Sequence, residues 1–214
     1  MPAARHPLRA KVCEGSGAAA GADLASTPAR TAACRDRTET LLTDPSTATL
    51  VAEQIRVTEE TLNGVEELLR SIDDGALHRA NPDGGWTGAQ VVSHMTLAGL
   101  LWAGDVARLQ ADPELDFFYR EEIGHDTVGA VPPTAAEAAD KIASLRRTMV
   151  TTLPMHTPEI LARSVEITTL GRMTVAQWLP IIVGHVVHHR DQLHDVLRSR
   201  DLLPARFDTA GESS

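Results

Sequence analysis

One short pattern recurs three times in the chain and restricts what the chain can fold into. A threonine is followed three positions later by glutamine or glutamate at Thr87–Gln90, Thr134–Glu137 and Thr174–Gln177. In such a capping box the threonine hydroxyl accepts a hydrogen bond from the backbone at the third helical position, and the later side chain reaches back to the threonine N–H. The pattern predicts three helix starts, and proline in Asp44–Pro45 predicts a fourth ahead of them.

The segments after these starts carry apolar residues at helical spacing over about 20 residues each. We expect the first helix to end at the Asp-Asp-Gly breaker at 73–75 and the third to run to about Leu153, before a proline. Between the third and fourth, residues 157–173 predict a short helical turn and then an extended pair that turns at Gly171. Four helices with one longer link, 111–133, predict an all-α four-helix bundle.

Composition argues against several classes of protein. The chain is 43% hydrophobic and 3% aromatic, and its net charge is -9. A nucleic-acid binder needs clustered Lys and Arg, and a membrane span needs roughly 18 consecutive apolar residues; the sequence has neither. Cys13 and Cys34 show no metal-binding or disulfide spacing. We therefore expect a cytoplasmic protein with no nucleic-acid or membrane partner.

The ends of the chain differ from its centre. Residues 1–45 show no sustained helical or alternating pattern, which predicts a disordered N-terminal extension. The bundle is expected over residues 46–204, followed by a C-terminal tail over 205–214. Apolar residues on the amphipathic helices would also serve a homodimer.

A run of histidines stands in the fourth helical segment, in the stretch GHVVHHRDQ at 184–192. At 100° per residue His185 and His189 are about 40° apart and share the core-facing stripe with Trp178 and Ile181. His188 falls on the shoulder of this stripe, and His194 on the solvent side. Two histidines one turn apart can present their ring nitrogens to one metal ion.

A third histidine, His94, points inward from the second helical segment. A single inward histidine is usually a core residue with a hydrogen-bond partner, and that alternative stays open for each ring. Three inward histidines are each costly to bury, and a common metal ion explains them together. Asp105 shares the face of His94 but lies about 16 Å along the helix, too far to be a ligand.

These residues resemble the DinB/YfiT-like superfamily. The resemblance spans roughly residues 47–203 and is carried by GWTGAQVVSHM, TTLGRMTVAQWL and GHVVHHRDQLHDVLRS. Its most specific part is H-x-x-H-H-x-x-Q on the fourth helix, matched by His185, His188, His189 and Gln192. Many members have glycine before this glutamine, where the chain has Asp191.

The resemblance implies a four-helix bundle with a three-histidine site for a divalent metal. The first ligand of the family lies shortly after a Trp-Ser/Thr helix start, matched by Trp86, Thr87 and His94, and the remaining ligands correspond to His185 and His189. Gln192 is expected to lie behind the ligands and to orient an imidazole or bound water. Trp86 and Trp178 are interpreted as hydrophobic staples of their helices rather than as substrate platforms.

Several branches of the superfamily use the thiols bacillithiol or mycothiol. The leading hypothesis is a metal-dependent thiol S-transferase that acts on small electrophiles. Arginine outnumbers lysine 18 to 2, a bias of GC-rich genomes; an actinobacterial source would make mycothiol the thiol. The alternatives are a hydrolase that uses metal-bound hydroxide and a non-catalytic metal-binding stress protein. Zinc, nickel and iron all suit imidazole ligands, and no catalytic residue is assigned.

Overall fold

The computed structural model describes residues 45–81, 84–118, 127–168 and 170–208. The described residues all belong to the second of the two units into which the chain divides, 38–214. The extension predicted for residues 1–45 therefore lies, except for its last residue, outside the described part of the chain. Both cysteines lie there too.

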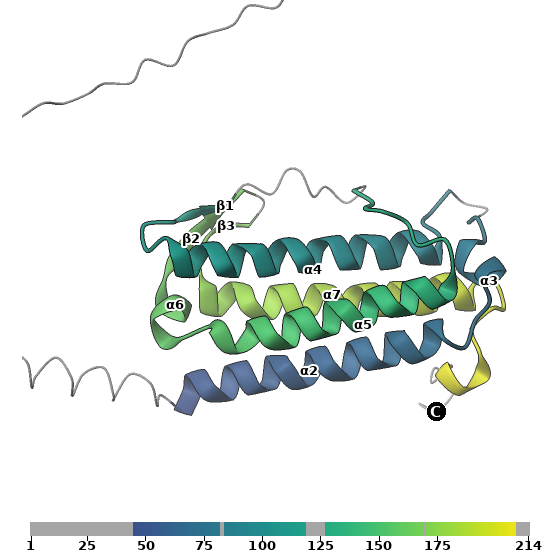
Figure 1. Cartoon of the computed structure of the whole chain (residues 1–214), viewed down its shortest axis with the longest axis horizontal. Coiled ribbons are helices and arrows are strands. Elements are labelled where there is room, and N and C mark those ends of the chain that lie inside the picture. The colour runs from purple at the N-terminus through teal and green to yellow at the C-terminus, as the bar shows by residue number, and fades with distance from the viewer. Residues whose placement is uncertain (1–44, 82–83, 119–126, 169, 209–214) are drawn as a thin grey trace, which may run out of the picture. The chain divides into compact units, whose positions relative to one another are not determined.

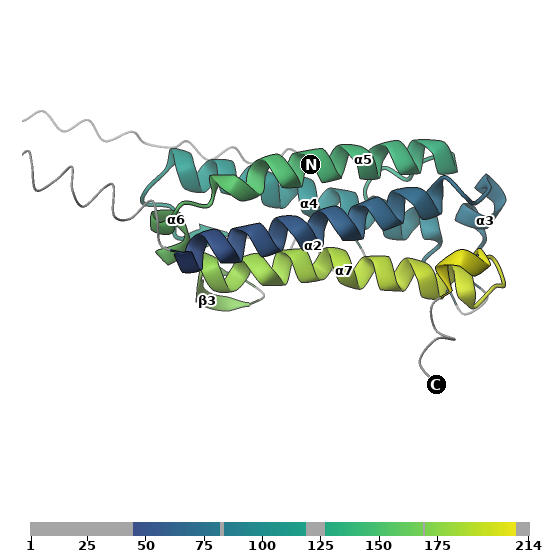
Figure 2. The ribbon, with the colours of Figure 1, turned by 90° about the horizontal axis from the view of Figure 1, so that it is seen from below.

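Four long helices build the second unit (Figure 1): α2 Pro45–Leu69, α4 Gly88–Ala111, α5 Ala135–Thr152 and α7 Val175–Arg198. Helices α2 and α4 each pack against both α5 and α7, so the ring of neighbours runs α2, α5, α4, α7. Figure 2 shows the same four helices lying lengthwise side by side from a second direction. The all-α four-helix bundle predicted from the sequence is confirmed.

The order of the helices in the bundle follows from a small sheet at one end. Strand β1, Phe117–Phe118, follows α4 and pairs in parallel with β2, Ser164–Ile167, which follows α5. The carboxyl ends of α4 and α5 therefore lie at the same end of the bundle, so the chain returns to the opposite end before α5 begins (Figure 1). Such a crossover joins parallel helices, unlike the short turns of an up-and-down bundle.

The capping boxes form as predicted at both helices that carry the histidines. At α4 the Gln90 N–H donates to Thr87 Oγ1 (3.2 Å) and the Thr87 N–H donates to Gln90 Oε1 (2.9 Å). Thr174 and Gln177 make the same pair of bonds at α7, with equal distances. At α5 the Thr134 hydroxyl accepts from the Glu137 N–H. A Thr cap of this kind stabilises a helix by about 1 kcal/mol.

The sequence does not predict a short helix after α2, nor strand β1. The Asp-Asp-Gly stretch does not terminate the first helix; α2 ends earlier, and Asp73 instead caps a further short helix, α3 Asp74–His78, by accepting the Ala76 N–H (2.6 Å). Aspartate favours a helix start as readily as a turn, so the pattern alone was ambiguous. Strand β1 was missed because its two residues are too few to show an alternating pattern.

The connection into α7 agrees with the prediction. It comprises the 3-10 turn η1, Leu153–Met155, the short helix α6, Pro158–Ala162, strand β2, and strand β3, Gly171–Thr174. Strands β2 and β3 pair in an antiparallel hairpin. Gly171 has a φ of 77°, in the left-handed region that favours glycine. After α7 the chain closes with a 3-10 turn, η2, Ala205–Phe207.

The core between the four helices is aliphatic, with two tryptophans. Trp102 and Trp178 are each 1% exposed, and they belong to one buried cluster to which all four long helices contribute aliphatic side chains. Full burial of one such aliphatic side chain contributes about 1.5–3 kcal/mol. Within the described ranges, none of the helices is long and apolar enough to cross a membrane.

Candidate metal centre

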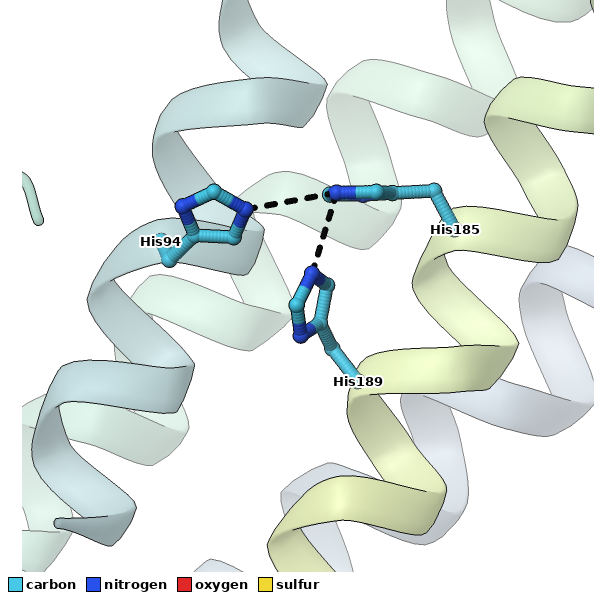
Figure 3. A group of neighbouring side chains, drawn as sticks. All are labelled: His94, His185 and His189. Atoms are coloured by element: carbon cyan, nitrogen blue, oxygen red, sulfur yellow. Dashed lines mark hydrogen bonds between the residues drawn. The ribbon is translucent and has the colours of Figure 1, made fainter. Parts of the chain in front are cut away.

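The three predicted ligands meet between two helices. His94 comes from α4, and His185 and His189 come from successive turns of α7 (Figure 3). The potential ligand atoms of the three rings all lie within 4.8 Å of one another. His94 and His189 are buried, with 4% and 5% of their surface exposed, whereas His185 is half-buried. The site therefore lies at the edge of the core, with one ligand open to its surroundings.

Hydrogen bonds at the far side of two rings fix the position of their protons. The Nδ1–H of His94 donates to the backbone carbonyl oxygen of Thr127 (2.8 Å). The Nδ1–H of His189 donates to the side-chain oxygen of Gln192 (2.7 Å), one turn further along α7. Both partners are acceptors, so each neutral ring carries its proton on Nδ1 and a lone pair on Nε2.

These lone pairs converge on the third ring. The Nε2 atom of His185 lies 3.3 Å from Nε2 of His94 and 3.0 Å from Nε2 of His189 (Figure 3). A neutral ring nitrogen holds either one proton or one lone pair, so His185 can donate to only one of these two neighbours. Hydrogen bonds among the rings thus cannot satisfy all three nitrogens, whereas a cation between them would.

The spacing also fits the coordination geometry of such a cation. Imidazole nitrogens bind zinc at about 2.0–2.1 Å, which places two nitrogens of a tetrahedral site about 3.3 Å apart. The Nε2 atom of His185 is 3.3 Å from that of His94 and 3.0 Å from that of His189, close to this value. Ligating histidines typically donate their other N–H to a carbonyl or carboxylate oxygen, as His94 and His189 do here to Thr127 and Gln192. The residues present therefore fit a three-histidine metal site.

The other histidines of α7 lie outside this cluster, as the helical wheel predicts. His188 is exposed, and its ring centre is 5.1 Å from that of His189. His194 is half-buried beside Phe207 at a hollow of about 500 Å³, on the side of α7 opposite the cluster. Partial burial, with the positive charges of Arg190 and Arg198, lowers the pKa of His194 below its ordinary value.

One residue of the predicted core-facing stripe is not in the core. Ile181, one turn before His185, is 43% exposed. A helical wheel gives the direction of a side chain but not whether a neighbouring element covers it, and at this level of α7 no described element covers Ile181 fully. Trp178, one turn earlier still, is in the core as predicted.

Trp86 lies at the cluster. The sequence pattern predicts only a hydrophobic staple of α4 at Trp86. Its ring centre is 4.9 Å from that of His94, and it is stacked on His189 at 6.3 Å with an angle of 24° between the planes. Trp86 therefore lies against two of the three histidines. Its position directly before the cap of α4 was the only sequence signal for this contact.

Comparison with known proteins agrees with the fold. The family model of the DinB superfamily matches residues 57–193, which include all three histidines. Two solved structures are similar: a DinB-like protein from Bacillus cereus (21% identity, TM-score 0.48, 68% of this chain and 89% of that chain) and YfiT from Bacillus subtilis (18%, 0.52, 71% and 87%). YfiT is described as a probable metal-dependent hydrolase with an unusual four-helix bundle topology. No curated protein is similar enough to count as a match.

The fold and the histidine cluster define a four-helix bundle with a candidate three-histidine metal site between α4 and α7. The chain belongs to the DinB superfamily.

Proposed function

We propose that the protein is a metal-dependent enzyme in which His94, His185 and His189 hold a divalent cation that activates a low-molecular-weight thiol. The observation that carries the proposal is the convergence of the three Nε2 atoms, two of them with lone pairs fixed by hydrogen bonds at Nδ1. A purely structural zinc site is usually closed by four protein ligands, whereas catalytic sites have three and keep one position open.

Three neutral ligands leave the full charge of a divalent cation for its remaining partner. When bound, the cation would lower the pKa of a thiol or of water at its open position. In the transferase reaction the thiol proton passes to solvent, sulfur forms a bond to an electrophilic carbon of the substrate, and the bond from that carbon to its leaving group breaks. Trp86, above His94 and His189, would exclude water from one side of the reacting sulfur.

The ligand set favours a thiol over water as the nucleophile. Within the described residues, the cluster that could hold an ion consists of three histidines and includes no carboxylate. Many metal-dependent hydrolases place a carboxylate beside the metal as a general base for the attacking water. A thiol that has lost its single proton to solvent attacks without such a base.

A hydrolase is the second candidate. YfiT, which has the same fold at 18% identity, is described as a probable metal-dependent hydrolase, and activated water is within the chemistry of three imidazole ligands. A non-catalytic metal-binding protein is the third candidate. Gln192 holds the ring of His189 under all three proposals, because its role concerns metal binding.

The proposal includes the metal, the thiol, the cellular location and the assembly of the enzyme. Zinc, nickel or iron would suit the imidazole ligands, and mycothiol is the proposed thiol. The substrate would be a small electrophile. We propose a cytoplasmic protein, with a homodimer as one assembly and no nucleic-acid partner, since a net charge of -9 disfavours binding to phosphates.

A conjugation assay tests the transferase. The purified protein is stripped of metal, reloaded with zinc, nickel or iron, and incubated with mycothiol and monochlorobimane. We expect conjugation that needs the metal and that falls at least about 100-fold in His94→Ala and His185→Ala, because each variant removes a proposed ligand. His188→Ala, an exposed neighbour on the same helix, is the matched control and is expected to keep its activity.

The same preparations separate the candidates. Metal-dependent turnover of ester or amide substrates without any thiol would favour the hydrolase. Metal binding with no turnover in either assay would favour the non-catalytic protein. Full conjugation by both histidine variants would contradict the proposed site.

A further inference from the structure

His94 and His189 both donate a hydrogen bond from Nδ1, but their acceptors lie in different parts of the chain. His189 is held by Gln192, which belongs to the same helix and lies three residues away. His94 is held by the carbonyl oxygen of Thr127, which belongs to the link between α4 and α5 and lies 33 residues away. The orientation of His94 therefore depends on how closely this link packs against α4.

The link approaches α4 through a glycine. A Cβ atom built on Gly129 would lie 3.2 Å from Ser93 Oγ, 3.4 Å from Leu97 Cβ and 3.5 Å from the Ser93 carbonyl oxygen. The first distance is shorter than about nine in ten contacts that real Cβ atoms make, and the other two are ordinary van der Waals distances to atoms fixed to the helix backbone. The backbone at residue 129 thus rests directly on the turn of α4 that carries His94.

Other contacts hold the same segment from outside. Lys141 Nζ of α5 donates to the Ala130 carbonyl oxygen (2.5 Å), and a ring nitrogen of His78 in α3 lies 3.1 Å from the Pro133 carbonyl oxygen. The segment is therefore confined between α4 and these anchors. A side chain at residue 129 would require Ser93 or the segment itself to shift by a few tenths of an ångström.

We infer that Gly129 is a positioning residue for the metal centre: its missing side chain lets the link lie on Ser93 and Leu97, so that the Thr127 carbonyl oxygen reaches Nδ1 of His94. This inference rests on the proposed metal site. The carbonyl keeps the proton of His94 on Nδ1 and leaves the lone pair of Nε2 facing the other two rings. Loss of a hydrogen-bond partner behind a ligand typically weakens metal binding 10–100-fold.

The test compares two glycines that flank the site. Gly129→Ala and Gly129→Val are expected to weaken zinc binding by about 10-fold and up to about 100-fold, measured by competition with a chelator of known affinity. Gly184→Val, next to His185, is the matched control, because a Cβ at Gly184 meets nothing within 4 Å. It should bind zinc as the wild type does.

A second substitution separates positioning from general damage. The Ser93 hydroxyl is buried and has no hydrogen-bond partner among the described residues, so Ser93→Ala alone should be tolerated. Because it removes the atom nearest to the added methyl group, Ser93→Ala should restore zinc binding in Gly129→Ala. Additive effects of the two substitutions would contradict the inference.

A readout without metal keeps the inference separate from the proposed function. In the metal-free protein, at a pH where the imidazoles are neutral, long-range ¹⁵N NMR should show His94 protonated on Nδ1 and Gly129→Val should shift it toward a mixture of tautomers. If the wild type binds no zinc, the proposed function fails and this spectrum still tests the role of Gly129. An unchanged spectrum, or zinc binding by Gly129→Val equal to the wild type, overturns the inference.

Discussion

Two buried histidines in this bundle have similar surroundings but differ at one ring nitrogen. His156, in the turn after η1, is 2% exposed; its Nδ1–H donates to the Leu153 carbonyl oxygen (2.9 Å) and its ring stacks on Trp102 at 5.7 Å. His94, in the cluster, is as deeply buried, donates from Nδ1 to a carbonyl oxygen in the same way, and contacts a tryptophan ring.

The two environments differ in the second ring nitrogen. Nε2 of His156 is buried without a hydrogen-bond partner in the described part of the chain, whereas Nε2 of His94 faces another imidazole at 3.3 Å. Burial and an anchored Nδ1 are therefore common to a core histidine and to a candidate ligand. What distinguishes the candidate metal centre is that several Nε2 atoms converge on one point.

The largest expected effect on zinc binding comes from a comparison of two variants, each of which removes the imidazole ring from one of the two environments. His185→Ala should weaken zinc binding by more than about 100-fold, because it deletes the ring on which the other two converge. His156→Phe keeps a ring against Trp102 and should leave zinc affinity unchanged. The measurement is a competition titration with a chelator on the two variants and the wild type. Equal zinc affinities in His185→Ala and the wild type would show that the convergence of the Nε2 atoms has no role in zinc binding.

A smaller effect is expected from the partner of His189. Gln192→Leu removes the acceptor for Nδ1–H and should weaken zinc binding 10–100-fold, whereas Gln192→Glu supplies a carboxylate acceptor and should retain or strengthen it. Asp191→Ala, an exposed neighbour, serves as the control. The same loss of affinity in Gln192→Leu and Gln192→Glu would mean that the hydrogen bond to His189 is not what matters.

The smallest effect concerns stability rather than metal binding. Burial lowers the pKa of His156 below its ordinary value of 6.5. The unfolded chain therefore takes up a proton at this residue before the folded protein does, so the stability it contributes is present above pH 6.5 and decreases as pH falls from there toward the lowered pKa. The metal-free wild type should lose more free energy of unfolding than His156→Phe over this range.

Denaturant unfolding at several pH values measures this difference. Trp102→Phe is the control, because it keeps the imidazole of His156 and should keep the wild-type dependence on pH even if the protein is less stable overall. Parallel pH profiles for the wild type and His156→Phe would contradict the assignment.

The parts of the fold and of the candidate metal centre that could be predicted are those that depend on residues close together in the sequence. The starts of α4 and α7 follow from threonine and glutamine three residues apart, and the convergence of His185 and His189 follows from one turn of helix. Nothing local revealed the partner of His94, because a backbone carbonyl such as that of Thr127 has no sequence signature. The role of Gly129 likewise depends on contact with α4, which only the fold provides. The exposure of Ile181 was missed for the same reason.

X-ray absorption spectroscopy of the zinc-loaded protein tests the central claim most directly. The account predicts one zinc ion per chain, with three imidazole nitrogens at about 2.0–2.1 Å and one further light atom, and a signal for two imidazoles in His94→Ala. Failure to take up zinc, sulfur ligands from Cys13 or Cys34, or a spectrum unchanged by His94→Ala would contradict it.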